Sequence, residues 1–252
     1  MEASTVPSSK EAGFGATERK DRWWLAPSMT ALGLSAFVAY STLRILQHDA
    51  YSSNALLSPF FVHFRISKDM PFWIALFFLG PPLMFRVTCY YYRKAYYRAF
   101  FADPPACAVG EPGNRPGYEG ETKLPFLLQN SHRYFLYLAL PLIPLHWANV
   151  VHACVWEKDL HVSTGTVILA ANAFLLMVYT LSCHSLRHLL GGKIDCFSCV
   201  ALGKARYGMW RGVSILNARH MFWAWASLFS LTVSDAYVWM VASGRIEDTR
   251  LL

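Results

Sequence analysis

The chain has 252 residues, of which 54% are hydrophobic and only 15% are charged, and its formal net charge is +7 at pH 7. Soluble domains carry about 25% charged residues, so this composition excludes an ordinary soluble globular domain. The basic residues gather in a few segments between apolar stretches, which is a pattern of membrane orientation. We therefore expect no nucleic-acid partner.

Five long apolar segments predict membrane-spanning helices, because about 20 apolar residues are enough to cross the bilayer core. The segments are residues 24–47, 71–89, 134–156, 163–190 and 220–244. They leave no room for a separate globular domain, so we expect an all-α integral membrane protein with five transmembrane helices in an anchor domain of residues 23–244. A cytoplasmic N-terminal tail (1–22), cytoplasmic loops 93–133 and 191–217, and a short external tail (245–252) complete this organisation.

The distribution of lysine and arginine predicts the direction of insertion. Sixteen of the 23 basic residues fall on one side of the expected spans, with Arg187 at the end of the fourth segment counted there. Five fall on the other side, and Arg44 and Arg86 lie inside spans. Basic residues favour the cytoplasmic side. We therefore expect a multi-pass protein of the cell inner (plasma) membrane with its N-terminus inside and its C-terminus outside.

Histidines and cysteines are concentrated at the cytoplasmic end of the fourth segment. His184 and His188 are four residues apart on one helical face, and Cys196 and Cys199 form a Cys-x-x-Cys turn. Imidazoles and thiolates are ligands of zinc and of iron–sulfur clusters. We predict a metal centre held by these four residues, with Cys183 as an alternative ligand. Two histidines and two cysteines are the ligand inventory of a Rieske-type [2Fe–2S] cluster.

Other interpretations of the same residues stay open. A structural or regulatory zinc site would use the same ligands, and the residues could also be interfacial histidines and redox-sensitive thiols without a metal. A disulfide between Cys196 and Cys199 is disfavoured in a reducing cytoplasm. The spacing alone does not decide between these possibilities.

A b-type haem is the runner-up cofactor, and it needs two histidines at one depth. His146 lies about 18 Å into its span, and no histidine in another span matches that depth, which disfavours a haem at mid-membrane. At the inner edge, however, His132, His184, His188 and His220 share a level, so a haem there remains an alternative.

Ionisable residues inside spans are costly and tend to be paired or functional. Arg86 and Asp235 differ in expected depth by about 15 Å, so they should not pair. Arg44, near the outer end of its span, matches the depth of Asp235 better. We predict a structural ion pair between Arg44 and Asp235.

A quinone site needs a flat apolar slot and hydrogen-bond donors near water. Such donors beside aromatic rings occur at the cytoplasmic ends of the third and fifth segments. The candidates are His132, Arg133, Tyr134, Arg219, His220 and Trp223.

The five-span layout, the segment Cys-His-Ser-Leu-Arg-His-Leu-Leu-Gly-Gly from Cys183 and the segment Asn-Ala-Arg-His-Met-Phe-Trp-Ala-Trp from Asn217 resemble a known family. The chain is similar to the single-chain, five-helix membrane anchor of a bacterial succinate dehydrogenase (succinate:quinone oxidoreductase), of the kind with a Rieske-type cluster in the membrane subunit. The resemblance covers the fourth and fifth segments well and the rest mainly by layout.

The resemblance implies that flavoprotein and iron–sulfur subunits bind the cytoplasmic face and that electrons from succinate pass through the cluster to menaquinone in the membrane. The chain would then be a non-flavin subunit without a complete catalytic site of its own. Membrane lipid and quinone are further expected partners, and a trimer of complexes is left open beside a single complex. A second class of function, a membrane protein with a zinc site and no electron transfer, also remains open.

Overall fold

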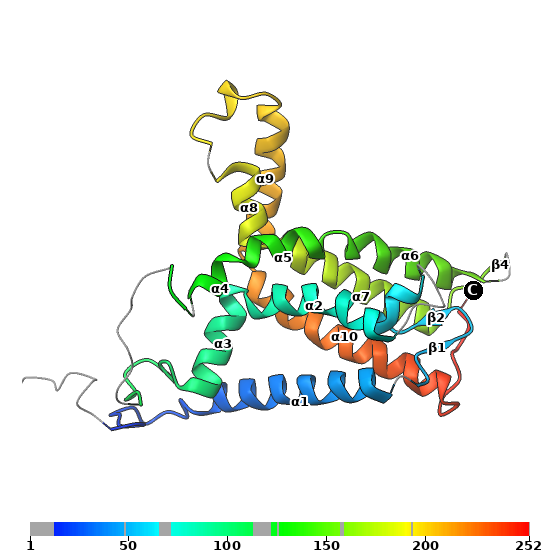
Figure 1. The fold of residues 1–252 in the computed structure, drawn as a ribbon, viewed down its shortest axis with the longest axis horizontal. Helices are drawn as coiled ribbons and strands as arrows, with labels where there is room; N and C mark the ends of the chain where they lie inside the picture. The colour runs from blue at the N-terminus through cyan, green and yellow to red at the C-terminus, as the bar shows by residue number, and fades with distance from the viewer. Residues whose placement is uncertain are drawn as a thin grey trace, which may run out of the picture. The chain divides into compact units, whose positions relative to one another are not determined.

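The computed structural model describes residues 13–47, 49–65, 72–112, 122–124, 126–156, 159–192 and 194–251. Helices make up most of this part of the chain (Figure 1). The helices are α1 (Leu25–Gln47), α2 (Phe72–Val87), α3 (Tyr90–Phe101), α4 (Phe126–Asn130), α5 (His132–Ala139), α6 (Leu142–Cys154), α7 (Thr164–Leu181), α8 (His184–Gly191), α9 (Gly203–Asn217) and α10 (His220–Ala242). Two short 3-10 helices are η1 (Pro59–Arg65) and η2 (Phe197–Cys199). Two small antiparallel hairpins pair β1 (Ser52–Ser53) with β2 (Leu56–Leu57), and β3 (Val155–Trp156) with β4 (Asp159–Leu160).

The chain forms two compact units. The smaller unit comprises residues 1–42 and 87–130, and the larger unit comprises residues 43–86 and 131–252. The first contains most of α1 together with α3 and α4, and the second contains α2, α5 to α10 and the small hairpins. All the residues of the candidate sites described below belong to the larger unit.

The larger unit is a helical bundle in which α7 packs along both α10 and α6 (Figure 1). Its core consists of Leu56, Val150, Ala153, Leu169, Ala173 and Val238. The two alanines allow the helix backbones to approach closely, and close packing is the main attraction between helices inside a bilayer. Gly165 allows a similar approach at one end of α7, because a Cβ atom there would lie 2.5 Å from Cδ1 of Leu56.

Apolar side chains also cover the outside of this bundle. Val151, Phe174, Phe229 and Val233 are between 48% and 61% exposed. A large apolar exterior is unusual in a soluble protein and is expected where helices face lipid. In the part of the chain that the structure describes, three helical stretches are long and apolar enough to cross a membrane: Leu25–Gln47, Phe126–Cys154 and Thr164–Leu181. The chain is therefore a predominantly helical membrane protein, as the sequence predicts.

The other two predicted spans are also helical. The fifth forms α10, with 23 residues, and the second forms α2, with 16 residues and two internal prolines. Cys89 is extended (ψ 131°) and separates α2 from α3 at the end of the predicted segment.

The fourth predicted span, residues 163–190, is two helices rather than one. It begins as predicted, because Ser163 caps α7 in a reciprocal capping box with Thr166. The helix ends at Leu181, however, and an extended Cys183 (ψ 137°) directs the chain into α8. Helices α8 and α9 form a hairpin that runs across the direction of α7 (Figure 1). Gly192, which follows α8, has a φ of −68° and therefore keeps a right-handed backbone conformation.

In the smaller unit, the N-terminal segment is bonded to the loop that follows α3. The backbone amide of Gly15 donates to the carbonyl of Gly110, and the amide of Gly110 donates to the carbonyl of Ala16. Thr17 and Arg19 add side-chain hydrogen bonds to carbonyls of the same loop. The described part of the predicted tail therefore packs against the predicted cytoplasmic loop.

The C-terminal segment is also ordered against its neighbours. Asp248 accepts hydrogen bonds from the backbone amide of Gly165 at 2.9 Å and from the hydroxyl of Tyr237 at 2.8 Å. A carboxylate at the first turn of α7 is favourable because helix N-terminal amides are free donors and carry partial positive charge. These bonds hold residues 245–251 on the bundle.

Candidate functional site

The four predicted metal ligands do not assemble into one centre. His184 and His188 lie on α8, whereas Cys196 and Cys199 lie at the tip of the α8–α9 hairpin and are joined to each other by a disulfide. Within the described ranges, no group of three histidine, cysteine or acidic side chains is arranged to hold a metal ion. These four residues, as arranged, do not fit a Rieske-type cluster or a four-ligand zinc site.

The length and direction of α8 explain this outcome. Helix α8 has eight residues, so His184 lies about 12 Å from the end of the helix at which the tip begins. At the tip, η2 brings the Cα atoms of Cys196 and Cys199 to 5.4 Å, a separation that a disulfide requires. The expectation that these cysteines stay unpaired is therefore wrong for this structure.

Cys183, the alternative ligand, has a different environment. Its side chain is 1% exposed at the corner between α7 and α8, and its sulfur lies 3.2 Å from Nε2 of His132 on α5. His184 follows Cys183 directly and is the first residue of α8. Burial, and then the neighbouring Arg187 and His188, lower the pKa of His184. A thiol and two imidazoles thus lie together at the base of the hairpin.

Aromatic rings and histidines stack in the bundle next to this corner. Phe85 of α2 stacks on His132 with centroids 4.6 Å apart and meets the edge of Tyr179 at 5.5 Å. Tyr179 in turn stacks on His220 at 5.2 Å. The rings of His132 and His220, which the sequence analysis placed on separate spans, are therefore connected through two aromatic side chains.

Polar contacts fix the histidine at the start of α10. Nδ1 of His220 lies 2.6 Å from the hydroxyl of Ser182, and both side chains are buried. Asn217 donates to the carbonyl of Ser182 at 2.8 Å, which satisfies a backbone acceptor at the end of α7. The hydroxyl of Ser182 and the imidazole of His220 can share one proton between them.

Arg86 adds a buried positive charge to the same cluster. Its guanidinium lies over the ring of Tyr179 at 4.6 Å and donates to the carbonyl of Ala224 and the hydroxyl of Ser227. Such a cation over an aromatic face is favourable when both are away from water. Ser227 precedes Asp235 by eight residues, or about 12 Å, along α10, which agrees with the expected difference in depth between Arg86 and Asp235.

The predicted quinone residues divide into two groups. His132, His220 and Trp223 lie in or beside the stacked cluster, and the buried indole N–H of Trp223 has no hydrogen-bond partner among the residues that the structure describes. Arg133, Tyr134 and Arg219 are exposed. Sequence reasoning missed Phe85, Tyr179 and Ser182, because an aromatic ring or a serine inside an apolar segment gives no signal of its own.

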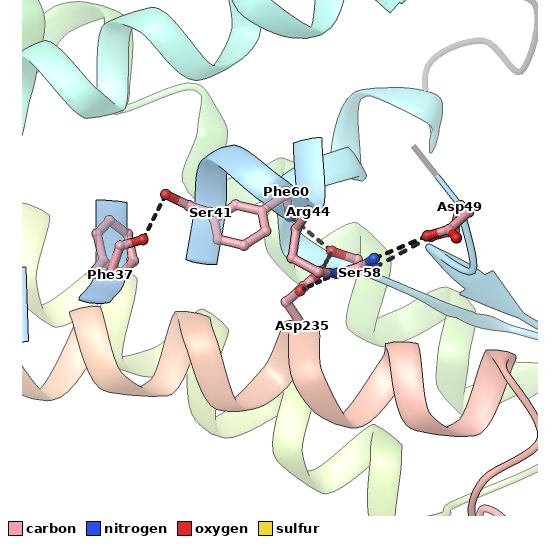
Figure 2. A network of polar contacts seen from close by, with 7 residues as sticks. All are labelled: Phe37, Ser41, Arg44, Asp49, Ser58, Phe60 and Asp235. Atoms are coloured by element: carbon pink, nitrogen blue, oxygen red, sulfur yellow. Dashed lines mark hydrogen bonds and ion pairs between the residues drawn. The ribbon is translucent and has the colours of Figure 1, made fainter. Parts of the chain in front are cut away.

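A second buried polar network lies at the opposite end of α10 (Figure 2). Nε of Arg44 donates to Asp235 at 2.9 Å, and the hydroxyl of Ser58 donates to the other carboxylate oxygen at 2.5 Å. Asp235 is 0% exposed and Arg44 is 4% exposed. Arg44 also reaches Asp49, whose side chain is 65% exposed. The predicted Arg44–Asp235 pair is confirmed.

Together, the lipid-facing helices, the buried ion pair and the histidine–aromatic cluster define a helical membrane subunit with one polar site at the end of its bundle. Residues 25–244 match the family model of the actinobacterial succinate dehydrogenase subunit SdhC. The chain belongs to this family, and so it is a subunit of an enzyme rather than a complete enzyme.

A solved structure agrees with this assignment. The chain is 43% identical to a chain in the structure described as the Mycobacterium smegmatis Sdh1 complex in the apo form. The alignment covers 94% of each chain, with a TM-score of 0.83. No curated protein matches the chain.

Proposed function

We propose that the chain anchors a succinate dehydrogenase complex in the plasma membrane and passes electrons from cytoplasmic flavoprotein and iron–sulfur subunits to menaquinone. Membership of the SdhC family supports this role. The quinone-binding part of this proposal rests on the cluster around His220 at one end of the bundle. The cluster contains histidines and a buried tyrosine, and the buried indole N–H of Trp223 has no hydrogen-bond partner among the described residues.

The proposed topology has five membrane-spanning helices, with the N-terminus inside and the C-terminus outside. The sixteen-to-five division of basic residues supports this direction. In this orientation the α8–α9 hairpin and the histidine–aromatic cluster lie at the cytoplasmic end of the bundle, where soluble subunits would bind.

Reduction of menaquinone to menaquinol consumes two electrons and two protons, and the chain offers groups for binding and for proton transfer. The indole N–H of Trp223 can donate to one quinone carbonyl. His220, bonded to Ser182, can hold and pass a proton at its imidazole. The charge of Arg86, held over Tyr179, stabilises negative charge that develops as electrons arrive. Arg133, Tyr134 and Arg219 are exposed at the same end, and in this proposal they contact headgroups or the quinone at the entrance.

The Rieske-type [2Fe–2S] cluster stays a prediction of the resemblance. Cys196 and Cys199 are bonded to each other away from the bundle, so we derive no electron-transfer step through a cluster held by them. Cys183 is the better placed thiol, because it is buried and already contacts an imidazole. We propose Cys183 as one of the two thiolate ligands that such a cluster requires.

Purification from the native membrane in mild detergent tests this proposal. Flavin and iron should co-purify with the chain, and recovery of the chain without them would refute the anchor role. An EPR and visible spectrum of the same sample separates the cofactors: a reduced Rieske signal indicates the cluster, Soret bands indicate haem b, and neither signal together with bound zinc indicates the zinc site. The mass of the complex distinguishes a trimer from a single complex.

A further inference from the structure

Helix α9 has one packed stripe and one exposed stripe. Arg206, Trp210 and Ser214 face α8, because Arg206 donates to the carbonyl of Leu190 while Arg187 donates to Ser214 and lies over the ring of Trp210. The opposite stripe holds Lys204, Gly208, Arg211 and Ile215, all of them exposed. Spacings of four, three and four residues place these side chains in one line along the helix. This stripe faces away from the rest of the hairpin.

The exposed face combines cations with apolar side chains. Ile215, in line with Lys204 and Arg211, is 67% exposed, and Met209, at the margin of the exposed face, is 50% exposed. Helix α9 contains no acidic residue. A helix with this composition binds the interface of an anionic membrane, because its apolar side chains enter the headgroup region while lysine and arginine meet phosphate.

The direction of the hairpin agrees with such a position. It runs across the axis of α7 and α10, and α9 is the member of the hairpin on the side toward which the bundle extends (Figure 1). If α7 and α10 cross the membrane, as the proposed function requires, the hairpin lies parallel to the membrane surface and α9 lies between α8 and the bilayer. The exposed stripe is then directed at the headgroups.

We propose that the exposed face of α9 binds the headgroups of anionic phospholipids and holds the α8–α9 hairpin flat on the cytoplasmic surface of the membrane. Lys204 and Arg211 contact the phosphates, and Ile215 enters the interface beside them. The positive charge of the face identifies the partner as anionic, and its interleaved apolar side chains identify it as a lipid surface. This inference rests on the proposed membrane topology, and it adds a lipid site to the anchor.

The first test compares the complex carrying Lys204→Gln and Arg211→Gln with a matched control carrying Lys204→Arg and Arg211→Lys, which keeps both charges at the same exposed positions. Each complex is placed in nanodiscs of phosphatidylglycerol and phosphatidylcholine, and the phosphatidylglycerol that it retains is counted by native mass spectrometry. One cation at a membrane surface contributes about fivefold in affinity, so the double variant should bind phosphatidylglycerol roughly 30-fold more weakly. The control should bind it like the unmodified complex.

Equal phosphatidylglycerol retention by the double variant and the unmodified complex would overturn the proposal. Loss of flavin and iron from the double variant, with lipid retention unchanged, would also overturn it and would assign the face to a soluble subunit. Absence of flavin and iron from the unmodified complex would refute the proposed function instead, and the lipid count on the chain alone would still test α9.

A second test locates the face without removing charge. A nitroxide label on Gly208→Cys, in a Cys107→Ser background, should be relaxed by oxygen and shielded from a water-soluble nickel chelate. There is nothing within 4 Å of a Cβ atom at Gly208, so the label fits. A label on Ala201→Cys, at an exposed position beyond the disulfide, serves as the aqueous control. Equal access of the nickel chelate to both labels would contradict the proposed position.

Discussion

Arg44 and Asp235 are 191 residues apart in the sequence, and their side chains meet at 2.9 Å in the interior of the bundle. Both carboxylate oxygens of Asp235 are bonded, one to Arg44 and one to Ser58. The pair joins the end of α1 to α10, and Asp49 connects it to the surface. A charge at this depth persists only if it is paired, so the pair fixes the register of two spans that are distant in sequence.

Removal of one partner of this pair should destabilise the complex more than removal of both. Arg44→Met leaves the Asp235 carboxylate buried without its cation, and a loss of about 3 kcal/mol is expected because breaking a buried pair typically costs 3–5 kcal/mol. The double variant with Asp235→Leu should recover much of that loss. Thermal denaturation of the purified complex, followed by circular dichroism, measures the difference. Arg22→Met, at an exposed position, is the control, and additive single and double effects would contradict the pairing.

The contact between Cys183 and His132 leads to a prediction about the cluster. If Cys183 is a ligand, Cys183→Ser abolishes the Rieske EPR signal, because serine does not replace a thiolate at this iron site. Cys199→Ser should leave the signal intact, because Cys199 is bonded to Cys196 at the hairpin tip. EPR of dithionite-reduced membranes measures both variants. The reverse result would restore the ligand set predicted from the sequence.

The indole N–H of Trp223 leads to a prediction about quinone reduction. Trp223→Phe keeps the ring but removes the donor, and loss of one hydrogen bond should lower kcat/KM for a menaquinone analogue about three- to tenfold. Succinate-driven reduction of a water-soluble acceptor should not change, because it does not use the membrane site. Trp225→Phe, two residues further along α10, is the matched control. A loss that is equal with both acceptors would indicate damage to assembly instead.

The charge distribution leads to a prediction about topology. A reporter that is active only in the cytoplasm should work at the N-terminus and fail after Leu252, whereas an export-dependent reporter should show the opposite pattern. This result follows from five spans and from the excess of basic residues on the cytoplasmic side. Activity of the same reporter at both ends would mean that the number of spans is even.

The sequence predicted features that depend on the length of apolar segments and on depth. The apolar segments marked the helices of the bundle, the fourth segment began at residue 163, where α7 is capped, and counting along two spans matched Arg44 to Asp235. The depth match follows from the fixed rise of a helix. The sequence also placed His132 and His220 at one level, and the structure connects their rings through Phe85 and Tyr179.

The sequence did not predict the corner at Ser182 and Cys183. The apolar pattern continues from α7 into α8, and a change of direction between two helices leaves no mark in such a pattern. The predicted ligand set depended on that direction, so Cys196 and Cys199 were placed beside histidines that they do not reach. The stacking of Phe85 and Tyr179 on the histidines depends on packing between spans, which a single sequence does not specify.

The bonds of Asp248 have a consequence for the far end of the chain. The carboxylate accepts hydrogen bonds from Gly165 at the first turn of α7 and from Tyr237 on α10, so the C-terminal segment connects these two helices. At their other ends, the same two helices are connected by the α8–α9 hairpin. Helices α7 and α10 are thus connected at both ends of the bundle. Loss of the Asp248 carboxylate should therefore loosen the two helices at the end of the bundle that lies away from the histidine–aromatic cluster.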